Sequence, residues 1–316
     1  MLGFLNALPG AVSQGLIWGI MAMGVYITFR ILEVSDLTVD GSICTGGAVF
    51  VVLFTGGTNL WLALLCATLA GMLAGLVTGL LHTFCGIPAI LAGILTQLGL
   101  YSINMAIMGM KATVAINITN PDTLDKLLIS LRFVQDVSKG TRPFYRHPIF
   151  VVGLLTAVII AILYWFFGTE LGCSLRATGS NPNMARAQGI NTDFTKVLGL
   201  MIANGLVALS GALLAQYTSS SEINMGRGAI VIGLAAVIIG EVVFGKLFRN
   251  FALKLLSVCF GAIIYYVVIQ AVLSMGLNSN YLKLLSALVV AVFLSLPYWK
   301  GKYFAKPVKK GGARHA

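Results

Sequence analysis

The chain has 316 residues, of which 58% are hydrophobic and only 10% are charged, and its mean hydropathy is +0.93. Soluble domains carry roughly 25% charged residues, so this composition excludes an ordinary soluble protein and predicts a membrane protein. The net charge of +11 would suit a nucleic-acid partner, but the sequence has no basic patch with interleaved aromatic residues, so we expect no nucleic-acid binding. We attribute the excess of Lys and Arg to loops on the cytoplasmic side of a membrane.

Apolar runs of roughly 20 residues predict the membrane-spanning helices. They fall at residues 11–29, 43–54, 60–81, 87–108, 149–167, 197–216, 230–244, 251–273 and 282–296. The expected fold is therefore all-α and polytopic, with about nine transmembrane helices in one transmembrane domain that covers the whole chain. The first charge is Arg30, so the first run has no charged flank ahead of it and is expected to be a retained span rather than a cleaved signal peptide.

Two of these runs are short, and each follows a polar segment, at residues 35–42 and 219–228. Short or interrupted spans at corresponding positions of two halves indicate an internal repeat. Each half has a long run, a polar break, a short run and two further long runs, and the run at 149–167 lies between the halves. Corresponding runs are five apart, an odd number, so the sequence predicts two inverted repeats.

The distribution of basic residues predicts the orientation in the membrane. The tail at 298–316 and the loop at 246–254 contain basic residues and no acid, so both should be cytoplasmic. With nine spans, the loop at 171–196 is then cytoplasmic as well, and the N-terminus is outside.

The loop at 109–147 becomes extracytoplasmic in this scheme, although residues 111–147 hold six basic and three acidic side chains. Long loops can cross a membrane despite such charge. Apolar residues inside the loop recur at helical spacing and predict one amphipathic helix on the outer surface. They are Leu124, Leu127, Leu128, Leu131 and Val134.

The polar insertion at 171–196 lies between two long apolar runs and contains a well-marked helix. Asn181 suits the N-cap, Pro182 the first helical position and Gly189 the position just after the helix. The helix would span about 10 Å, and a helix of this length is marginal alone in water. We therefore expect it to dock against another structure.

Polar residues near the short runs are candidates for a transport pathway or gate. Charged groups at membrane depth should face protein or a wet cavity, because lipid solvates them poorly. Helix capping or placement at the membrane interface would explain the charged ones equally well, and interhelical hydrogen bonding is the favoured explanation for the amides. The candidates are Asp36, Thr38, Asp40, Ser42, Gln97, Asn104, Asn204, Glu222 and Arg227.

Small residues recur every four positions at Gly71, Gly75 and Gly79. Such spacing lets two helices approach closely, and packing inside the chain is favoured over a dimer contact.

No sequence motif supports catalysis, metal binding or nucleotide binding by this chain. Residues 240–246 match most of a phosphate-binding loop, but Leu247 occupies the required Ser/Thr position and the match ends a membrane span. The five cysteines and three histidines lack the spacing of metal ligands. We therefore expect no catalytic residue, no metal site and no cofactor of its own.

The string LRATGSNPNMARAQGI, at residues 175–190, resembles the cytoplasmic coupling segment of ABC-importer permeases of the branched-chain amino-acid and ribose type. The stretch SDLTVDGS, at 35–42, resembles the polar segment ahead of a short span in that family. The longer strings YITFRILEVSDLTVDGS and LAGILTQLGLYSINMAIMG are similar to a poorly characterised subgroup associated with binding proteins for aromatic amino acids. The resemblance extends from about Gln14 to Leu296.

The resemblance implies a multi-pass, non-catalytic permease subunit in a bacterial cytoplasmic membrane. Two permease chains, a homodimer or a pair of paralogues, would form the pore within membrane lipid. Separate ABC ATPase subunits would use ATP, and an extracytoplasmic substrate-binding protein would deliver a small solute. An amino acid is the first choice, aromatic or branched-chain, while sugars and nucleosides stay open. The coupling residues carried over are Arg176, Gly179, Asn181, Pro182, Ala185, Arg186 and Gly189.

Three other interpretations compete with this one. A stand-alone channel or secondary transporter with inverted repeats would work without an ATPase. An intramembrane enzyme lacks support, because no convergent Ser/His pair, HExxH motif or carboxylate pair occurs. A membrane scaffold would not account for the capped helix and the paired short spans together.

Overall fold

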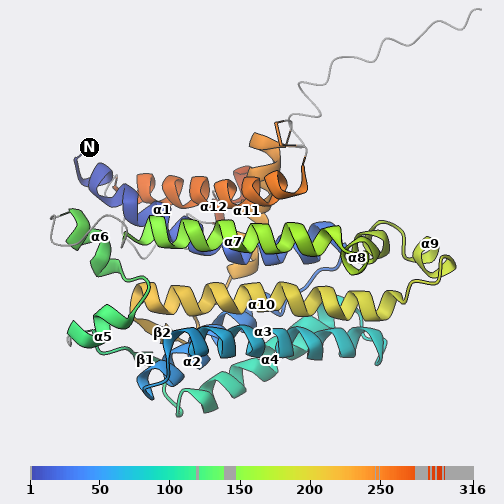
Figure 1. Ribbon diagram of the computed structural model, residues 1–316, viewed down its shortest axis with the longest axis horizontal. Helices are drawn as coiled ribbons and strands as arrows, with labels where there is room; N and C mark the ends of the chain where they lie inside the picture. Colours follow the sequence, from blue (N-terminus) through green and yellow to red (C-terminus); the bar gives the residue numbers. More distant parts are fainter. Residues whose placement is uncertain are drawn as a thin grey trace, which may run out of the picture.

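The computed structural model describes residues 2–118, 121–138, 147–245, 247–248, 250–274, 284, 287–288, 290–293 and 295. Long helices lie side by side along one axis, and short elements cap both ends (Figure 1). The helices are α1 (Leu2–Tyr26), η1 (Ile27–Ile31, a π-helical turn), α2 (Val39–Thr55), α3 (Leu60–Thr83), α4 (Ala89–Ile107), α5 (Pro121–Lys126), α6 (Leu131–Ser138), α7 (Pro148–Gly168), α8 (Glu170–Ser180), α9 (Pro182–Ala187), α10 (Thr192–Thr218), α11 (Ala229–Phe244) and α12 (Phe251–Ser274).

This architecture confirms the predicted all-α, polytopic fold. Within the described residues, six helices are long and apolar enough to cross a membrane, and α2 and α11 are shorter apolar helices. Helices dominate because they satisfy every backbone hydrogen bond within one segment, as a lipid environment requires. The predicted count of nine spans is not tested, because the last run, at 282–296, lies mostly outside the described residues.

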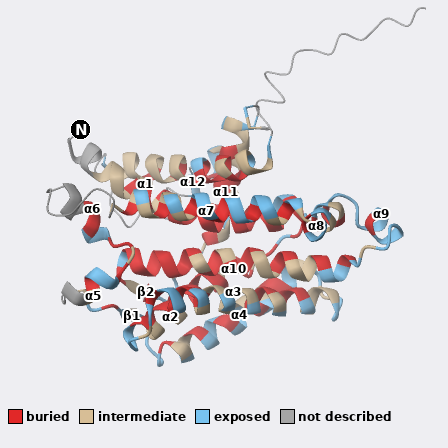
Figure 2. Ribbon diagram, viewed as in Figure 1, coloured by how far each residue is buried: buried red, intermediate tan, exposed pale blue. Residues whose placement is uncertain are grey.

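Helices α1 and α10 form the centre of the bundle. In the most apolar part of α10, 72% of the residues are buried, whereas the corresponding share is 28% in both α4 and α7 (Figure 2). The outer faces of α4 and α7 therefore remain available to lipid or to another chain.

Close helix contacts explain the glycine spacing on α3. A Cβ atom at Gly75 would collide with the backbone of Leu200, and one at Gly71 with the backbone of Asn204, both on α10. The predicted role of these glycines in packing inside the chain is confirmed.

The two halves exchange packing partners. Helix α1 packs against α12, and α10 packs against α3, so the first long helix of each half contacts the third helix of the other. Each short helix also packs against the first long helix of the other half, since α2 packs against α10 and α11 packs against α1. Helix α1 begins at the end of the molecule that holds α6, whereas α10 begins beside α9 at the opposite end (Figure 1). These opposed directions agree with the inverted repeat, which stays a prediction because the final run is mostly outside the described residues.

A small antiparallel sheet lies at the end opposite α9 and was absent from the predicted all-α fold. Strand β1 (Thr113–Ala115) pairs with β2 (Ser220–Glu222), with Val114 opposite Ser221. The polar segment after α10 is thus joined by backbone hydrogen bonds to the segment that follows α4.

The prediction of one amphipathic helix between Leu124 and Val134 was wrong, because the chain forms the separate helices α5 and α6. Two buried residues at the break, Ile129 and Ser130, explain the interruption, and the backbone amide of Leu128 there donates to the Gln216 side chain on α10. The spacing identified buried positions correctly at Leu124, Leu127 and Val134, but Leu131 is 49% exposed.

Candidate functional site

The predicted coupling segment lies at one end of the bundle and contains two helices, α8 and α9 (Figure 1). The prediction of a polar loop with a single short helix was therefore incomplete. Helix α8 begins where the backbone amide of Gly172 donates to the Thr169 hydroxyl, at 3.4 Å. It packs through buried Leu175, Thr178 and Gly179, which share one face at helical spacing.

The local structure of α9 is as predicted. The Asn181 side chain accepts a hydrogen bond from the backbone amide of Met184, at 3.1 Å, and Pro182 stands in the first turn. The helix ends before Gly189, whose φ of +83° is a left-handed conformation that a residue with a Cβ atom adopts only with strain. Ala185 faces the protein and is buried, whereas Met184 is 59% exposed.

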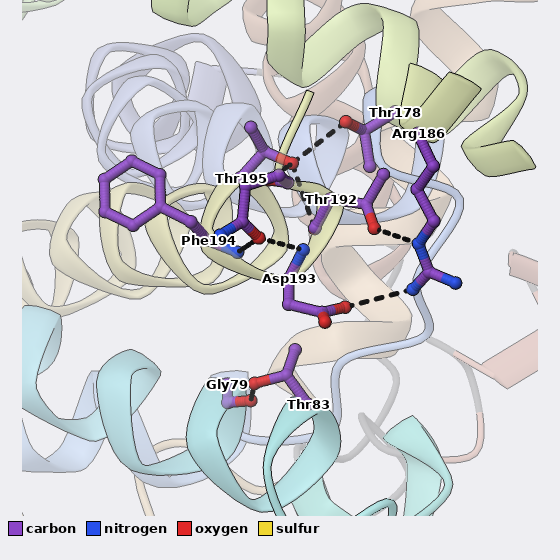
Figure 3. A network of polar contacts seen from close by, with 9 residues as sticks. Gly79, Thr83, Thr178, Arg186, Thr192, Asp193, Phe194 and Thr195 are labelled. Atoms are coloured by element: carbon purple, nitrogen blue, oxygen red, sulfur yellow. Dashed lines mark hydrogen bonds and ion pairs between the residues drawn. The ribbon is translucent and has the colours of Figure 1, made fainter. Parts of the chain in front are cut away.

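Arg186 connects α9 to the first turn of α10 (Figure 3). Its Nε donates to the Thr192 hydroxyl at 2.6 Å, and a terminal nitrogen donates to the Asp193 carboxylate at 3.2 Å. The same turn is capped by Asn191, whose side chain accepts from the backbone amides of Asp193 and Phe194. Arg186 therefore fixes α9 against α10 within the chain.

Two further predicted coupling residues fix α8 to the bundle. Arg176 donates to the carbonyl of Phe167 at the end of α7, and its guanidinium lies 5.7 Å from the ring centre of Phe251 on α12. Gly179 packs directly on the backbone of Ile31 in the π-helical turn. The hydroxyls of Thr178 and Thr195, 2.9 Å apart, join α8 to α10 (Figure 3).

Four of the predicted pathway residues, Asp36, Thr38, Ser42 and Asn204, form one buried network where the start of α2 meets α10 and α3. The Asp36 carboxylate accepts from the backbone amide of Thr38 at 2.9 Å and from the Asn204 amide at 2.7 Å. Ser42 donates to the Asn204 carbonyl oxygen at 2.6 Å, and the hydroxyls of Thr38 and Thr78 are 2.7 Å apart. All of these side chains are buried. For Asn204 this arrangement is the interhelical hydrogen bonding considered as the alternative to a pathway wall, and the roles of these residues in a pathway stay a prediction.

Asp40 connects the two short helices. Its two carboxylate oxygens accept from the backbone amides of Gly228 and Ile230, each at 3.0 Å, at the start of α11. Gly228, with φ of +84°, offers no side-chain cap of its own, so a residue of α2 caps α11 from across the interface.

Four predicted pathway residues meet at a cavity of about 280 Å³ beside this junction: Asp40, Gln97, Asn104 and Arg227. Tyr101 and Asn224 also line it. Asn104 is buried, and its Oδ1 has no hydrogen-bond partner among the described residues. Glu222 lies apart from this cavity on β2.

A second cavity, of about 460 Å³, lies between α1, α11 and α12 and shares Arg227 with the first. Its walls are mainly aromatic and aliphatic, and they include Trp18, Tyr265 and Tyr266.

Comparison with known proteins identifies the family. The model of the branched-chain amino acid transport system permease component matches residues 8–294. The chain belongs to this permease family. A tyrosine transport system permease protein of Clostridioides difficile is 37% identical over 291 residues, which cover 92% of this permease and 91% of the relative. An uncharacterized protein of Rickettsia prowazekii is 34% identical over 293 residues, 92% of this permease and 98% of the relative.

The chain is also similar to a more distant permease and, in fold alone, to one solved structure. An autoinducer 2 import system permease protein of Yersinia pestis is 29% identical over 187 residues, which cover 59% of this permease and 48% of that protein. PsaBC from Streptococcus pneumoniae, solved in complex with a Fab, has the same fold, with a TM-score of 0.53 and 16% identity over 96% of this permease and 100% of that chain. The permease is thus an ABC-importer permease of the branched-chain and ribose type, as the resemblance implied.

Sequence reasoning missed several residues that build these sites. Thr178, Asn191, Thr192, Asp193 and Thr195 hold the coupling segment together, and only the Asn-Thr-Asp start of α10 carried a local capping signal. Tyr101 and Asn224 were missed at the smaller cavity. Within the part of the chain that the structure describes, no group of three or more His, Cys, Asp or Glu side chains is placed to hold a metal ion.

Proposed function

We propose that this permease forms the membrane pore of an ATP-driven importer for an amino acid, and that an aromatic amino acid is its first candidate substrate. The tyrosine transport permease, 37% identical along nearly the whole chain, supports this choice. The chain itself is non-catalytic in this proposal, binds no cofactor, and depends on ATP that a separate ABC ATPase chain hydrolyses.

The geometry of α9 is the observation that best supports an ATP-driven mechanism. This short helix is capped at both ends and fixed to α10 through Arg186, and it presents the exposed side chain of Met184. Its neighbour α8 is fixed to α7 and α12 through Arg176. A partner that moves α9 would therefore move the helices of the bundle with it, whereas a loose loop would absorb the motion.

The proposed assembly has two copies of this permease, two ATPase chains on the cytoplasmic side and an extracytoplasmic binding protein. The end that holds α9 is then cytoplasmic, and the opposite end, where α1 begins, is outside (Figure 1). The basic tail at 298–316 is placed in the cytoplasm by its charge.

Reconstitution in proteoliposomes tests the proposal. The permease, its ATPase and its binding protein should take up radiolabelled tyrosine or a branched-chain amino acid when ATP is supplied. The permease alone should show no uptake. ATP-driven uptake of ribose or a nucleoside with no uptake of any amino acid would contradict the proposed substrate, and solute flux through the permease alone would favour a stand-alone transporter.

A further inference from the structure

We propose that the 280 Å³ cavity between α2, α4 and the start of α11 is a binding site for the zwitterionic head group of an α-amino acid, with Arg227 as the carboxylate ligand and Asn104 and Asp40 as acceptors for the ammonium group. This inference rests on the proposed amino-acid substrate. It extends that proposal because it gives the permease its own substrate contacts, in addition to any selection made by a binding protein.

The cavity lies well inside the length of the bundle, and it opens on a side where Leu98 and Tyr101 are exposed. The segment after β2 runs along α2, since the Cys44 thiol donates to the carbonyl of Ile223 and accepts from the backbone amide of Gly226. Helix α2 then continues from Asp40 to its end at Thr55, next to residues that share a cavity with α5. The distance along the helix from Asp40 to Thr55 is 15 residue steps, or roughly 22 Å. A solute that enters from the α5 end would therefore reach this cavity well inside the molecule.

Arg227 supplies a cation that has no carboxylate partner in the part of the chain that the structure describes. Arg30 pairs with Glu241 at 2.9 Å and Arg186 pairs with Asp193, but Arg227 forms no ion pair with the described residues and its side chain is exposed at the cavity. An arginine at membrane depth requires an anion or water, because lipid does not solvate it. The planar guanidinium fits a carboxylate through two parallel hydrogen bonds.

Asn104 and Asp40 supply the opposite polarity. Asn104 is 1% exposed, and its Oδ1 is a buried acceptor without a donor among the described residues. Asp40 lines the cavity, and its carboxylate oxygens accept from the backbone amides of Gly228 and Ile230. A carboxylate has about four lone-pair sites, so Asp40 keeps acceptor capacity for an ammonium group. An ammonium group carries three donors and no acceptor. It can therefore bind to the acceptors of Asn104 and Asp40, but not to the guanidinium of Arg227, which offers only donors.

The rest of the lining suits the side chain of an apolar or aromatic amino acid. Tyr101, Leu98 and Ile223 line the cavity beside the polar groups, and Tyr101 is 45% exposed. The larger cavity on the other side of Arg227 has no acidic residue among its described lining residues, so it lacks a partner for the ammonium group. Of the two cavities that Arg227 lines, the smaller one combines both charges.

Equilibrium binding to the permease–ATPase complex, without the binding protein, tests the site. The probes are radiolabelled tyrosine, tyramine, which lacks the carboxylate, and 4-hydroxyphenylpropionate, which lacks the ammonium group. Arg227→Ala should weaken tyrosine binding roughly tenfold and leave tyramine binding unchanged. Arg132→Ala, which removes an exposed arginine that donates to the Ile118 carbonyl away from the cavity, is the matched control and should change neither.

Asn104→Leu separates a ligand contact from a packing role. Removal of a buried acceptor without a partner should leave thermal stability unchanged or raise it. Tyrosine binding should nevertheless fall roughly tenfold, with 4-hydroxyphenylpropionate binding unchanged. If the wild-type complex imports tyrosine but both variants bind it as tightly as the wild type does, the site is wrong and the proposed function stands. If the wild-type complex neither binds nor imports any amino acid, the proposed function fails, and this inference fails with it.

Discussion

The carboxylate of Asp40, in the first turn of α2, accepts a hydrogen bond from the backbone amide of Ile230, in the first turn of α11, at 3.0 Å. The two short helices of the permease therefore meet at their N-terminal ends, and one helix supplies the cap of the other. Both N-terminal ends also border the cavity that holds Arg227 and Asn104. A movement of α11 relative to α2 would change this cavity directly.

Replacement of Asp40 by Ala should destabilise the permease by about 1–2 kcal/mol, the usual effect of losing an N-cap. The amides of Gly228 and Ile230 would lose their acceptor in a partly buried position. Denaturant unfolding of the purified permease in detergent measures the change. Glu222→Ala, which removes an exposed acid from β2, is the control and should stay within about 0.5 kcal/mol of the wild type. Equal stability of both variants would show that the cap contributes nothing.

Asn204→Leu should destabilise the permease by about 3 kcal/mol, because it removes one hydrogen-bond donor from the buried Asp36 carboxylate and the acceptor of the buried Ser42 hydroxyl. The double variant Asp36→Leu with Asn204→Leu should recover part of that loss, since it removes the buried charge as well. A double-mutant cycle read from unfolding midpoints measures the coupling. Strictly additive effects would contradict a direct interaction between Asp36 and Asn204.

Gly75→Ala should destabilise the bundle by about 2 kcal/mol, because the new methyl group would collide with the backbone of Leu200 on α10. Gly99 on α4 is the matched control, since a Cβ atom there meets no other atom within 4 Å. Gly99→Ala should be neutral or slightly stabilising, because Ala favours a helix over Gly. Thermal melting of the two variants in detergent makes the comparison, and equal melting temperatures would refute the close packing of α3 on α10.

Arg186→Glu should uncouple ATP hydrolysis from uptake while the permease still inserts and folds. The new carboxylate would face Asp193 and lose the contact with Thr192, so α9 would no longer be fixed to α10. The exchange Arg186→Glu with Asp193→Arg restores opposite charges and should recover part of the uptake. Gly189→Val should also uncouple, because its left-handed conformation would be strained. Uptake per ATP at the wild-type level in either single variant would contradict this role.

The sequence predicted the features that depend on local chemistry. Asn181, Pro182 and Gly189 act within a few residues of chain, so the start and end of α9 could be placed correctly. Apolar runs likewise located the long helices, because lipid imposes a minimum length on each.

Features that depend on contacts between residues far apart in the chain could not be predicted from the sequence. The pairing of Asp36 with Asn204 joins residues 168 positions apart, and no spacing rule connects them. Helix α8 was missed because its buried face, around Leu175, is narrow and interrupted by polar residues. The outer loop was wrongly predicted as one helix because the break at Ile129 and Ser130 depends on burial against the bundle.

If a partner ATPase moves the bundle through α9, as we propose, it must contact this helix, and the exposed Met184 side chain allows the most direct test. Co-purification of the ATPase with the Met184→Glu permease measures whether this surface is the contact. Met110→Glu, a similar change at an exposed methionine at the other end of the molecule, is the control. We predict that Met184→Glu loses the ATPase and ATP-driven uptake, whereas Met110→Glu keeps the ATPase bound. Retention of the ATPase and of uptake by Met184→Glu would contradict the account.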